Sequence, residues 1–376
     1  VAALVAGSKL SSKHLNAVMK ACVDGGDEVE DEDRFEPTKN PALKKAILDS
    51  RKAMIPENCV QRVMQFARQG YTEIEFPEYD TDWDSEAYLT VSGQNSNNTV
   101  RVDNAFLEKV LEDGEWDLIR RTDRKVEKRV RARDLWEQIG FSAWASADPG
   151  LQFDTTINDW HTCPNSGRIN ASNPCSEYMH LDNSACNLSS LNLMKFLAPD
   201  GKFDIDGFRH AVDIMTTAQD ILIDNSSYPT DSIGENARAY RELGLGYANL
   251  GSLLMSTGIP YDSDAGRGIC GALTALLTGQ AYLTSSEIAA HLGPFTGYRE
   301  NEQPMLDVMQ MHRDACEHID RACPAELREA ARQVWNECLQ SGRRHGYRNA
   351  QATVLAPTGT IAFMMDCDTT GIEPDI

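Results

Sequence analysis

Apolar residues at helical spacing predict three helices near the N-terminus of the chain. Residues 1–19 form the first, and the other two begin at Pro41 and Pro56, because proline is favoured at the first position of a helix. Between the first two helices, residues 24–36 contain eight acidic residues and two glycines, which indicates a solvated, mobile loop. Residues 1–86 are therefore predicted to form a helical and acidic peripheral insertion to which no chemistry is assigned.

After residue 86 the pattern changes to short apolar runs that are separated by stretches of helical periodicity. Strands are predicted over residues 87–91, 98–102, 151–157 and 352–355. The helices between them include a long one that places four apolar side chains on one face, namely those of Phe208, Val212, Met215 and Leu222. Strands and helices are thus both expected in this longer part of the chain.

Two local signals refine the predicted elements. Asp134 followed by Glu137 has the spacing of a capping box, which predicts that a helix begins there. Gly244, Gly246 and Gly251 do not have the spacing of the dinucleotide-binding fingerprint, which needs a third glycine three residues after the second. These glycines are therefore interpreted as positions where a strand and a helix pack closely together.

The composition limits the classes of partner. The chain has 376 residues, and its hydrophobic fraction of 41 % is sufficient for a sizeable core. The formal net charge of −21 argues against a general surface for nucleic acid or for anionic membranes. No apolar run reaches the roughly 18 residues that a membrane span needs. Neither nucleic acid nor membrane is expected as a partner, and the first residue, which is not methionine, suggests a piece of a longer protein.

The ten cysteines show no Cys-X-X-Cys pair, so most are expected to be reduced thiols of a cytoplasmic protein. One of them has unusual neighbours, because Asn173, Cys175 and Glu177 fall on alternate positions. On an extended backbone, these three side chains would point the same way. Pro174 has no N–H and argues against a central strand, so a loop tip inside a cavity fits better. Cys186 follows eleven residues after the first cysteine, at the start of a strand-like run.

A second group of candidate residues is Pro-Thr-Gly-Thr-Ile at 357–361, between a predicted strand and a predicted helix start. Such a turn can bind an anion, because Gly359 lets the backbone come close, free N–H groups face the anion, and threonine hydroxyls add donors. The segment is not a Walker A loop, since it lacks Gly-Lys-Thr. On its own, the pattern fits a tight turn without a ligand at least as well.

Several segments together resemble one enzyme family. Asn-Pro-Cys-Ser-Glu at 173–177, with a second cysteine at 186, resembles the finger-loop motif of ribonucleotide reductases, and most closely that of the adenosylcobalamin-dependent (class II) enzymes. Further segments resemble the same family in the same order: residues 92–102, 241–247, 356–362 and 366–374. The polar run 94–98 is either a turn or part of a barrel strand that enters the active site.

The resemblance implies an α/β fold in which residues 87–376 are an incomplete ten-stranded α/β barrel with a central finger loop that carries the radical cysteine. It implies that a thiyl radical at Cys175 abstracts the 3′-hydrogen of a ribose, while Glu177 acts as general base on the 3′-hydroxyl. Asn173 would orient the ribose hydroxyls. Cys186 would be one member of a redox dithiol that forms a disulfide with a cysteine outside this chain.

The resemblance also implies the ligands. The reaction would be the reduction of ribonucleoside diphosphates to 2′-deoxyribonucleoside diphosphates for DNA synthesis, with adenosylcobalamin as cofactor. A thioredoxin-like dithiol would act as reductant, and deoxynucleotides and ATP would act as effectors of the full-length protein. The expected substrate contacts come from the finger loop and from the loop that would hold the diphosphate: Asn173, Pro174, Cys175, Ser176, Glu177, Pro357, Thr358, Gly359, Thr360 and Ile361.

Three alternatives remain open at this stage. One is a class I-type large chain that depends on a separate metal-radical subunit. Another is a zinc-binding module, with either of two groups of mixed nitrogen and sulfur ligands, although neither has a recognised zinc spacing. These groups are His161, Cys163, Cys175 and His180, and His312, Cys316, His318 and Cys323. The last is a non-catalytic nucleotide-binding fragment.

Overall fold

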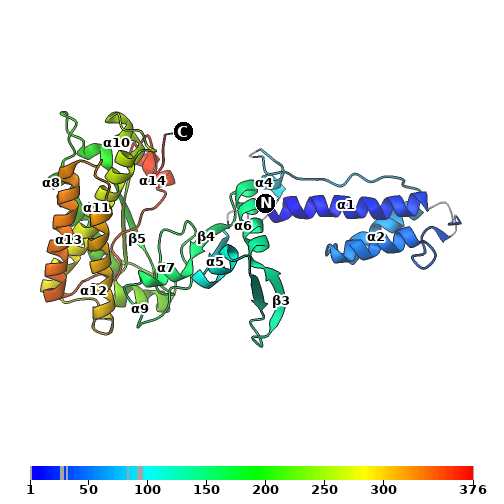
Figure 1. Cartoon of the computed structure of the whole chain (residues 1–376), viewed down its shortest axis with the longest axis horizontal. Helices are drawn as coiled ribbons and strands as arrows, with labels where there is room; N and C mark the ends of the chain where they lie inside the picture. The colour runs from blue at the N-terminus through cyan, green and yellow to red at the C-terminus, as the bar shows by residue number, and fades with distance from the viewer. Residues whose placement is uncertain (1, 26–28, 31–32, 83, 91–95, 376) are drawn as a thin grey trace. The chain divides into compact units, whose positions relative to one another are not determined.

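The computed structural model describes residues 2–25, 29–30, 33–82, 84–90 and 96–375, and Figure 1 shows their helices and strands. The chain divides into two compact units. The N-terminal unit comprises residues 1–101 and 105–151, and the C-terminal unit comprises residues 102–104 and 152–376. The division falls within two short strands, β1 (Thr99–Val102) and β4 (Gly150–Phe153). Within the described ranges, no helix has both the length and the apolar character that crossing a bilayer requires.

Three helices of the N-terminal unit pack around a small apolar core. They are α1 (Ala2–Asp24), α2 (Pro41–Lys52) and α3 (Glu57–Arg68). The side-chain oxygen of Asn40 accepts a hydrogen bond of 2.9 Å from the backbone N–H of Leu43, which fixes the start of α2. The three predicted helices are therefore present. Of the predicted acidic loop 24–36, residues 26–28 and 31–32 lie outside the described ranges.

The rest of the N-terminal unit differs from the prediction in two places. Residues predicted to start a strand form a helical turn, α4 (Ala87–Thr90), and Val91 lies outside the described ranges, as do residues 94 and 95 of the polar run. The predicted capping box is wrong, because α6 begins before Asp134 and its N-cap residue, Arg131, makes no side-chain cap. The remaining elements here are α5 (Asn104–Leu111), the antiparallel strands β2 (Glu115–Ile119) and β3 (Val126–Arg131), and α6 (Ala132–Ser146).

The C-terminal unit is built on parallel strands. β5 (Asn187–Asn192) and β6 (Leu243–Ala248) pair in parallel over their whole length. On the other side of β6, Leu245 forms a parallel bridge with Thr353, so the segment predicted as a strand at 352–355 lies next to β6 but pairs with it through this isolated bridge instead of a full strand. The strand predicted at 98–102 is present as β1. Mixed helix and strand structure is thus confirmed for this part of the chain.

Long helices accompany these strands. In Figure 1, α8 (Ile205–Asn225), α11 (Asp264–Leu292) and α13 (Ala325–His345) lie side by side, and α11 contacts both of the others. The predicted apolar face of α8 is buried at Phe208 and Val212, whereas Leu222 is 50 % exposed, so its assignment to that face is wrong. The other helices are α7 (Asp154–Asp159), α9 (Asp231–Tyr240), α10 (Leu250–Ser256), α12 (Tyr298–Ala315) and α14 (Gly359–Met364), with short 3₁₀ turns at Leu193–Phe196 and Cys316–His318.

Two glycines of β6 are required by what packs against the strand. A Cβ at Gly244 would collide with the sulfur of Cys186, and a Cβ at Gly246 would collide with the backbone oxygen of Val354. Both neighbours belong to segments beside β6 in the sheet, so the interpretation as strand–helix packing is wrong for these glycines. Their role is to let adjacent strands and one thiol approach closely.

Candidate active site

The segment with the candidate thiol forms a tight turn. The backbone N–H of Ser176 donates to the carbonyl oxygen of Asn173 (3.1 Å), and Ser176 has a left-handed backbone with φ of 65°. Because this backbone is not extended, the argument that Asn173, Cys175 and Glu177 point the same way from alternate positions is wrong. The turn predicted from Pro174 is present, but Pro174 and Cys175 do not line the cavity beside it, so the predicted place of the tip inside a cavity is wrong.

Side-chain hydrogen bonds hold this turn in place. Gln152 of β4 is almost fully buried, and its Nε2 donates to the hydroxyls of Ser172 (2.7 Å) and Ser176 (2.9 Å). The side-chain oxygen of Asn173 accepts a hydrogen bond of 3.0 Å from the backbone N–H of Tyr178. The residues after β4 form α7, so the predicted strand 151–157 is correct only in its first half. The turn is therefore anchored on both sides of the cysteine.

The side chains of the turn differ in exposure. Cys175 and Pro174 are exposed at its tip. Glu177 is partly buried, and its Oε2 atom has no hydrogen-bond partner among the described residues. A thiol that can be reached from outside thus lies two residues from a carboxylate oxygen that is free to accept a proton or a hydrogen bond.

Cys186 has a different environment. It directly precedes β5, and its sulfur fills the space that the missing side chain of Gly244 leaves in β6. Burial raises the pKa of the Cys186 thiol to about 12, and the carboxylates of Glu177 and Glu242 act in the same direction. Cys186 is therefore held in the thiol form over the physiological pH range.

A cavity of about 330 Å³ lies beside the turn. Asn173, Tyr178, His180 and Cys186 are among the residues that line it, so it brings together two of the predicted site residues. Cys175 is not part of this lining and lies at the exposed tip of the turn instead. The predicted cysteines thus occupy two different parts of the site.

The Pro-Thr-Gly-Thr segment has the predicted position directly before a helix. α14 begins at Gly359, Thr358 has a left-handed φ of 57°, and its hydroxyl accepts a hydrogen bond of 2.6 Å from the N–H of Gly371. Pro357, Gly359, Thr360 and Ile361 are exposed. The N–H groups of the first helical turn have no acceptor within the helix and remain available to a ligand.

The finger-loop segment and the Pro-Thr-Gly-Thr segment are connected by one aromatic side chain. Tyr178 is buried in a cluster with Val354 and Ala356, and Cys186 packs against the same cluster. Ala356 directly precedes Pro357. The two predicted halves of the site, which are far apart in the sequence, therefore meet through Tyr178.

A buried pair of His180 and Glu242 lies next to this cavity; sequence reasoning considered His180 only as a zinc ligand and gave Glu242 no role. The Nδ1 atom of His180 lies 3.1 Å from Oε1 of Glu242, and the two side chains are 1 % and 0 % exposed. Glu242 belongs to the segment 241–247 that carried the family resemblance, and its neighbour Arg241 is fixed by ion pairs with Asp220 (2.8 Å) and Asp224 (2.7 Å). In the sequence, the only sign of this pair was Glu242 itself, a charged residue directly before an apolar, glycine-rich strand.

The described residues do not support the zinc alternative. They contain no group of three or more histidine, cysteine or acidic side chains placed to hold one metal ion. The His312 ring stacks on Trp335 and contacts Trp160, and burial lowers the pKa of His312 to about 4. Burial also lowers the pKa of His161 to about 4, with nearby His180 acting in the same direction.

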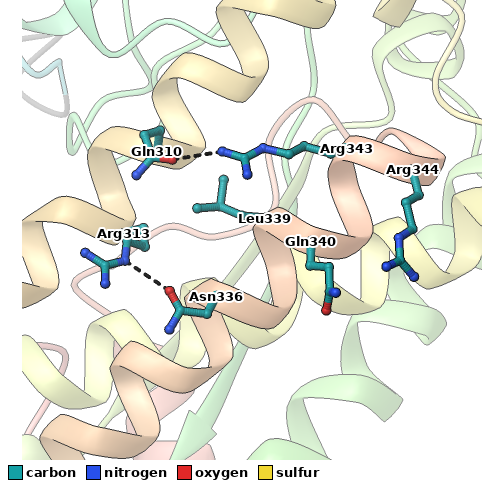
Figure 2. Close-up of a pocket in the computed structure, with 7 residues that line it drawn as sticks. All are labelled: Gln310, Arg313, Asn336, Leu339, Gln340, Arg343 and Arg344. Atoms are coloured by element: carbon teal, nitrogen blue, oxygen red, sulfur yellow. Dashed lines mark hydrogen bonds between the residues drawn. The ribbon is translucent and has the colours of Figure 1, made fainter.

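A second cavity, of about 370 Å³, lies between α12 and α13 (Figure 2). Two of its arginines have partners within the chain: Arg313 binds the side-chain oxygen of Asn336 and forms an ion pair with Glu317, and Arg343 binds Gln310. Arg343 also lies in the last turn of α13, where a positive charge complements the helix dipole. These contacts give the cluster a structural role, and it contains none of the predicted site residues.

A family model described as the barrel domain of ribonucleotide reductase matches residues 48–376. The chain belongs to the ribonucleotide reductase family. It is 54 % identical to a protein of Bradyrhizobium diazoefficiens named vitamin B12-dependent ribonucleotide reductase, over 100 % of this chain and 31 % of that protein. It is 57 % identical to a Rhodopirellula baltica protein of the same name, over 79 % of this chain and 29 % of that protein.

A more distant ribonucleotide reductase is similar too. It is a protein of Mycobacterium tuberculosis named vitamin B12-dependent ribonucleoside-diphosphate reductase, 34 % identical over 74 % of this chain and 34 % of that protein. The chain thus spans about a third of the length of the curated relatives that it matches. The segment before residue 87, which contains none of the resembling motifs, is included in the alignment that covers the whole chain.

Proposed function

We propose that the protein that contains this chain reduces ribonucleotides to 2′-deoxyribonucleotides and uses adenosylcobalamin as its source of radicals. The observation that carries the proposal is the turn at 173–176, with an exposed cysteine at its tip and a partly buried cysteine, Cys186, in the lining of the cavity beside it. The names of the relatives agree with this reaction and with a vitamin B12 cofactor.

Cys175 would carry the radical. Its exposure supports this role, because a radical source can reach the sulfur without displacing the turn. Pro174 and Cys175 are the residues of this chain that would face the cofactor. When bound, adenosylcobalamin would supply the radical through homolysis of its cobalt–carbon bond. The thiyl group of Cys175 would then abstract the 3′-hydrogen of the substrate ribose.

Glu177 and Asn173 would act on the ribose hydroxyls. The buried Oε2 of Glu177 has no hydrogen-bond partner among the described residues and could accept the proton of the 3′-hydroxyl as general base. The Oδ1 atom of Asn173 already accepts from Tyr178, which fixes the orientation of the amide. Its Nδ2 would then donate to a ribose hydroxyl.

Cys186 would supply electrons. Replacing the 2′-hydroxyl by hydrogen, with release of water, consumes two electrons. These would come from Cys186 and a second cysteine elsewhere in the full-length protein, and the two would form a disulfide. A thioredoxin-like dithiol would reduce the disulfide for the next turnover. The location of Cys186 in the cavity that Asn173 also lines supports this role.

The substrate would be a ribonucleoside diphosphate. Its diphosphate would bind at Pro357–Thr358–Gly359–Thr360–Ile361, where the residues that begin α14 are exposed and the N–H groups of its first turn have no acceptor within the helix. The contact of Tyr178 with Ala356 supports this placement, because it brings the phosphate loop next to the finger loop. The name of the Mycobacterium tuberculosis relative specifies a diphosphate substrate for that protein.

The proposed function implies an architecture for the full-length protein. Residues 87–376 would be part of the ten-stranded α/β barrel, with the turn at 173–176 as the tip of its finger loop and residues 1–86 as a peripheral, partly acidic insertion. The full-length enzyme would work in the cytoplasm and respond to deoxynucleotide and ATP effectors. Neither a nucleic acid nor a membrane is proposed as a partner.

The test is an anaerobic assay of CDP reduction by the full-length protein with a dithiol, with and without adenosylcobalamin. Activity that requires adenosylcobalamin is the expected result. Activity that requires a separate iron-bearing subunit instead would keep the reaction and contradict the cofactor. No deoxynucleotide under either condition, together with stoichiometric zinc in the purified protein, would contradict the proposed reaction.

A further inference from the structure

The buried pair of His180 and Glu242 has no role in the reaction described above. Their facing atoms lie 3.1 Å apart, and both side chains are almost completely shielded from solvent. Despite this short distance, neither nitrogen of His180 and neither carboxylate oxygen of Glu242 has a hydrogen-bond partner among the described residues. Burying unused hydrogen-bonding atoms costs stability, which points to a role of the pair toward a neighbouring group.

The sheet register identifies that neighbour. β5 and β6 pair in parallel with Asn187 opposite Leu243. The residues directly before them, Cys186 and Glu242, therefore lie at equivalent positions at the same end of the two strands. Aligned residues of parallel strands point to the same face. Gly244, on that face of β6, leaves the space that the Cys186 sulfur fills.

The positive charge next to Glu242 in the chain, Arg241, is already paired with Asp220 and Asp224. The finger loop contributes Glu177 and Tyr178, the segment after α7 contributes His161 and Cys163, and α9 contributes Tyr240. The ring of His180 contacts those of His161, Tyr178 and Tyr240 at centroid distances of 5.5, 6.5 and 6.0 Å. A negative charge on the Cys186 sulfur would thus meet two carboxylates, Glu177 and Glu242, in a largely buried environment.

We propose that Glu242, whose carboxylate lies beside the His180 ring, is a positioning residue that keeps the Cys186 sulfur protonated as a thiol. This inference rests on the proposed function, because a thiol that supplies electrons and a proton to the substrate must not be lost earlier as a thiolate. Thiolates, not thiols, are the species that oxidants and electrophiles attack. The exposed Cys175 has no such protection, and the two sulfurs of the site are thereby kept chemically distinct.

The test measures the alkylation rate of Cys186 against pH in the full-length protein, reduced and free of nucleotide and cobalamin, by mass spectrometry of the Cys186 peptide. Glu242→Gln keeps the shape and removes the negative charge. Its Cys186 is expected to react faster at pH 8.5, by about tenfold for each unit by which the apparent pKa falls. Glu242→Asp, which keeps the charge, is expected to stay within about threefold of the wild type.

Glu326→Gln is the matched control, because Glu326 is an exposed carboxylate at the start of α13. An equal alkylation rate in Glu242→Gln, Glu326→Gln and the wild type would overturn the proposal. If Glu242→Gln does not fold, the same alkylation series on the wild-type protein is the test. An apparent pKa of Cys186 between 8 and 9 would then overturn the proposal as well. Since the assay contains neither substrate nor cofactor, its outcome is independent of whether the protein reduces ribonucleotides.

Discussion

The two cysteines of the candidate site stand eleven residues apart in one segment, but their environments are opposite. Cys175 lies exposed at the tip of a turn that is held by hydrogen bonds from Gln152 and to Asn173. Cys186 lies against β6, among apolar side chains and two carboxylates, with its pKa raised to about 12. A radical site needs access, whereas a dithiol that waits for substrate needs protection. One short stretch of chain can therefore expose one cysteine and shield another from solvent when a turn separates the two.

The largest expected effect comes from removing the exposed sulfur. In the full-length protein, Cys175→Ser should abolish nucleotide reduction, because serine has no sulfur atom on which a thiyl radical could form. Nucleotide affinity should stay within about twofold, since the side chain is exposed and small. The measurement combines a deoxynucleotide assay with equilibrium binding of the diphosphate. Substantial residual reduction would show that Cys175 does not carry the radical.

Removing the buried sulfur should separate two steps of the same reaction. Cys186→Ser should still permit abstraction of the 3′-hydrogen but stop productive turnover, because the electrons for the second half of the reaction are missing. Release of tritium from 3′-labelled substrate measures the first step, and deoxynucleotide yield measures the second. If a folded Cys186→Ser variant released no tritium and formed no deoxynucleotide, Cys186 would be required for the radical step. The proposed difference in role between the two cysteines would then be wrong.

Local structure around this site was readable from the sequence, while the arrangement of its side chains was not. The turn at 173–176 followed from Pro174, which has no N–H, and the helix start at Gly359 followed from the strand and turn predicted before it. Helix α2 began where Asn40 and Pro41 placed it. Each of these is a local signal, which depends on residues next to one another in the chain.

The failures depended on contacts between distant residues. The alternate spacing of Asn173, Cys175 and Glu177 suggested one shared direction, but the hydrogen bonds of Gln152 fold the backbone into a turn. Glu242 received no role because its partner His180 is more than sixty positions away in the sequence. Gly244 was assigned to helix packing, since nothing in the sequence shows that Cys186 occupies its place.

A methyl group at Gly244 tests the buried side of the comparison. Gly244→Ala should lower the free energy of unfolding by about 1–3 kcal/mol, because the added Cβ collides with the Cys186 sulfur in a packed environment. It should also move Cys186 and slow its reduction of the substrate. Urea unfolding and the activity assay measure the two effects.

Gly271→Ala is the matched control for this variant. Its Cβ would meet only Ile319 at 3.8 Å, an ordinary contact, within the helix α11. Alanine is favoured over glycine inside a helix, so the control should be neutral or more stable by about 0.5–1 kcal/mol. If Gly244→Ala and Gly271→Ala lowered the free energy of unfolding equally, the packing of the Cys186 sulfur would not depend on the space at Gly244.

The smallest expected effect tests the exposed side of the comparison. Gln152→Ala removes two hydrogen bonds to the hydroxyls of Ser172 and Ser176 and should lower the free energy of unfolding by about 0.5–1.5 kcal/mol. The exposed control Gln340→Ala in α13 should change it by less than about 0.5 kcal/mol. Because Gln152 holds the turn but not the buried sulfur, the variant should alkylate Cys186 at the wild-type rate while it loses part of its reductase activity. Faster alkylation of Cys186 in Gln152→Ala would instead show that the turn and the environment of Cys186 are coupled, so that both depend on the hydrogen bonds of Gln152.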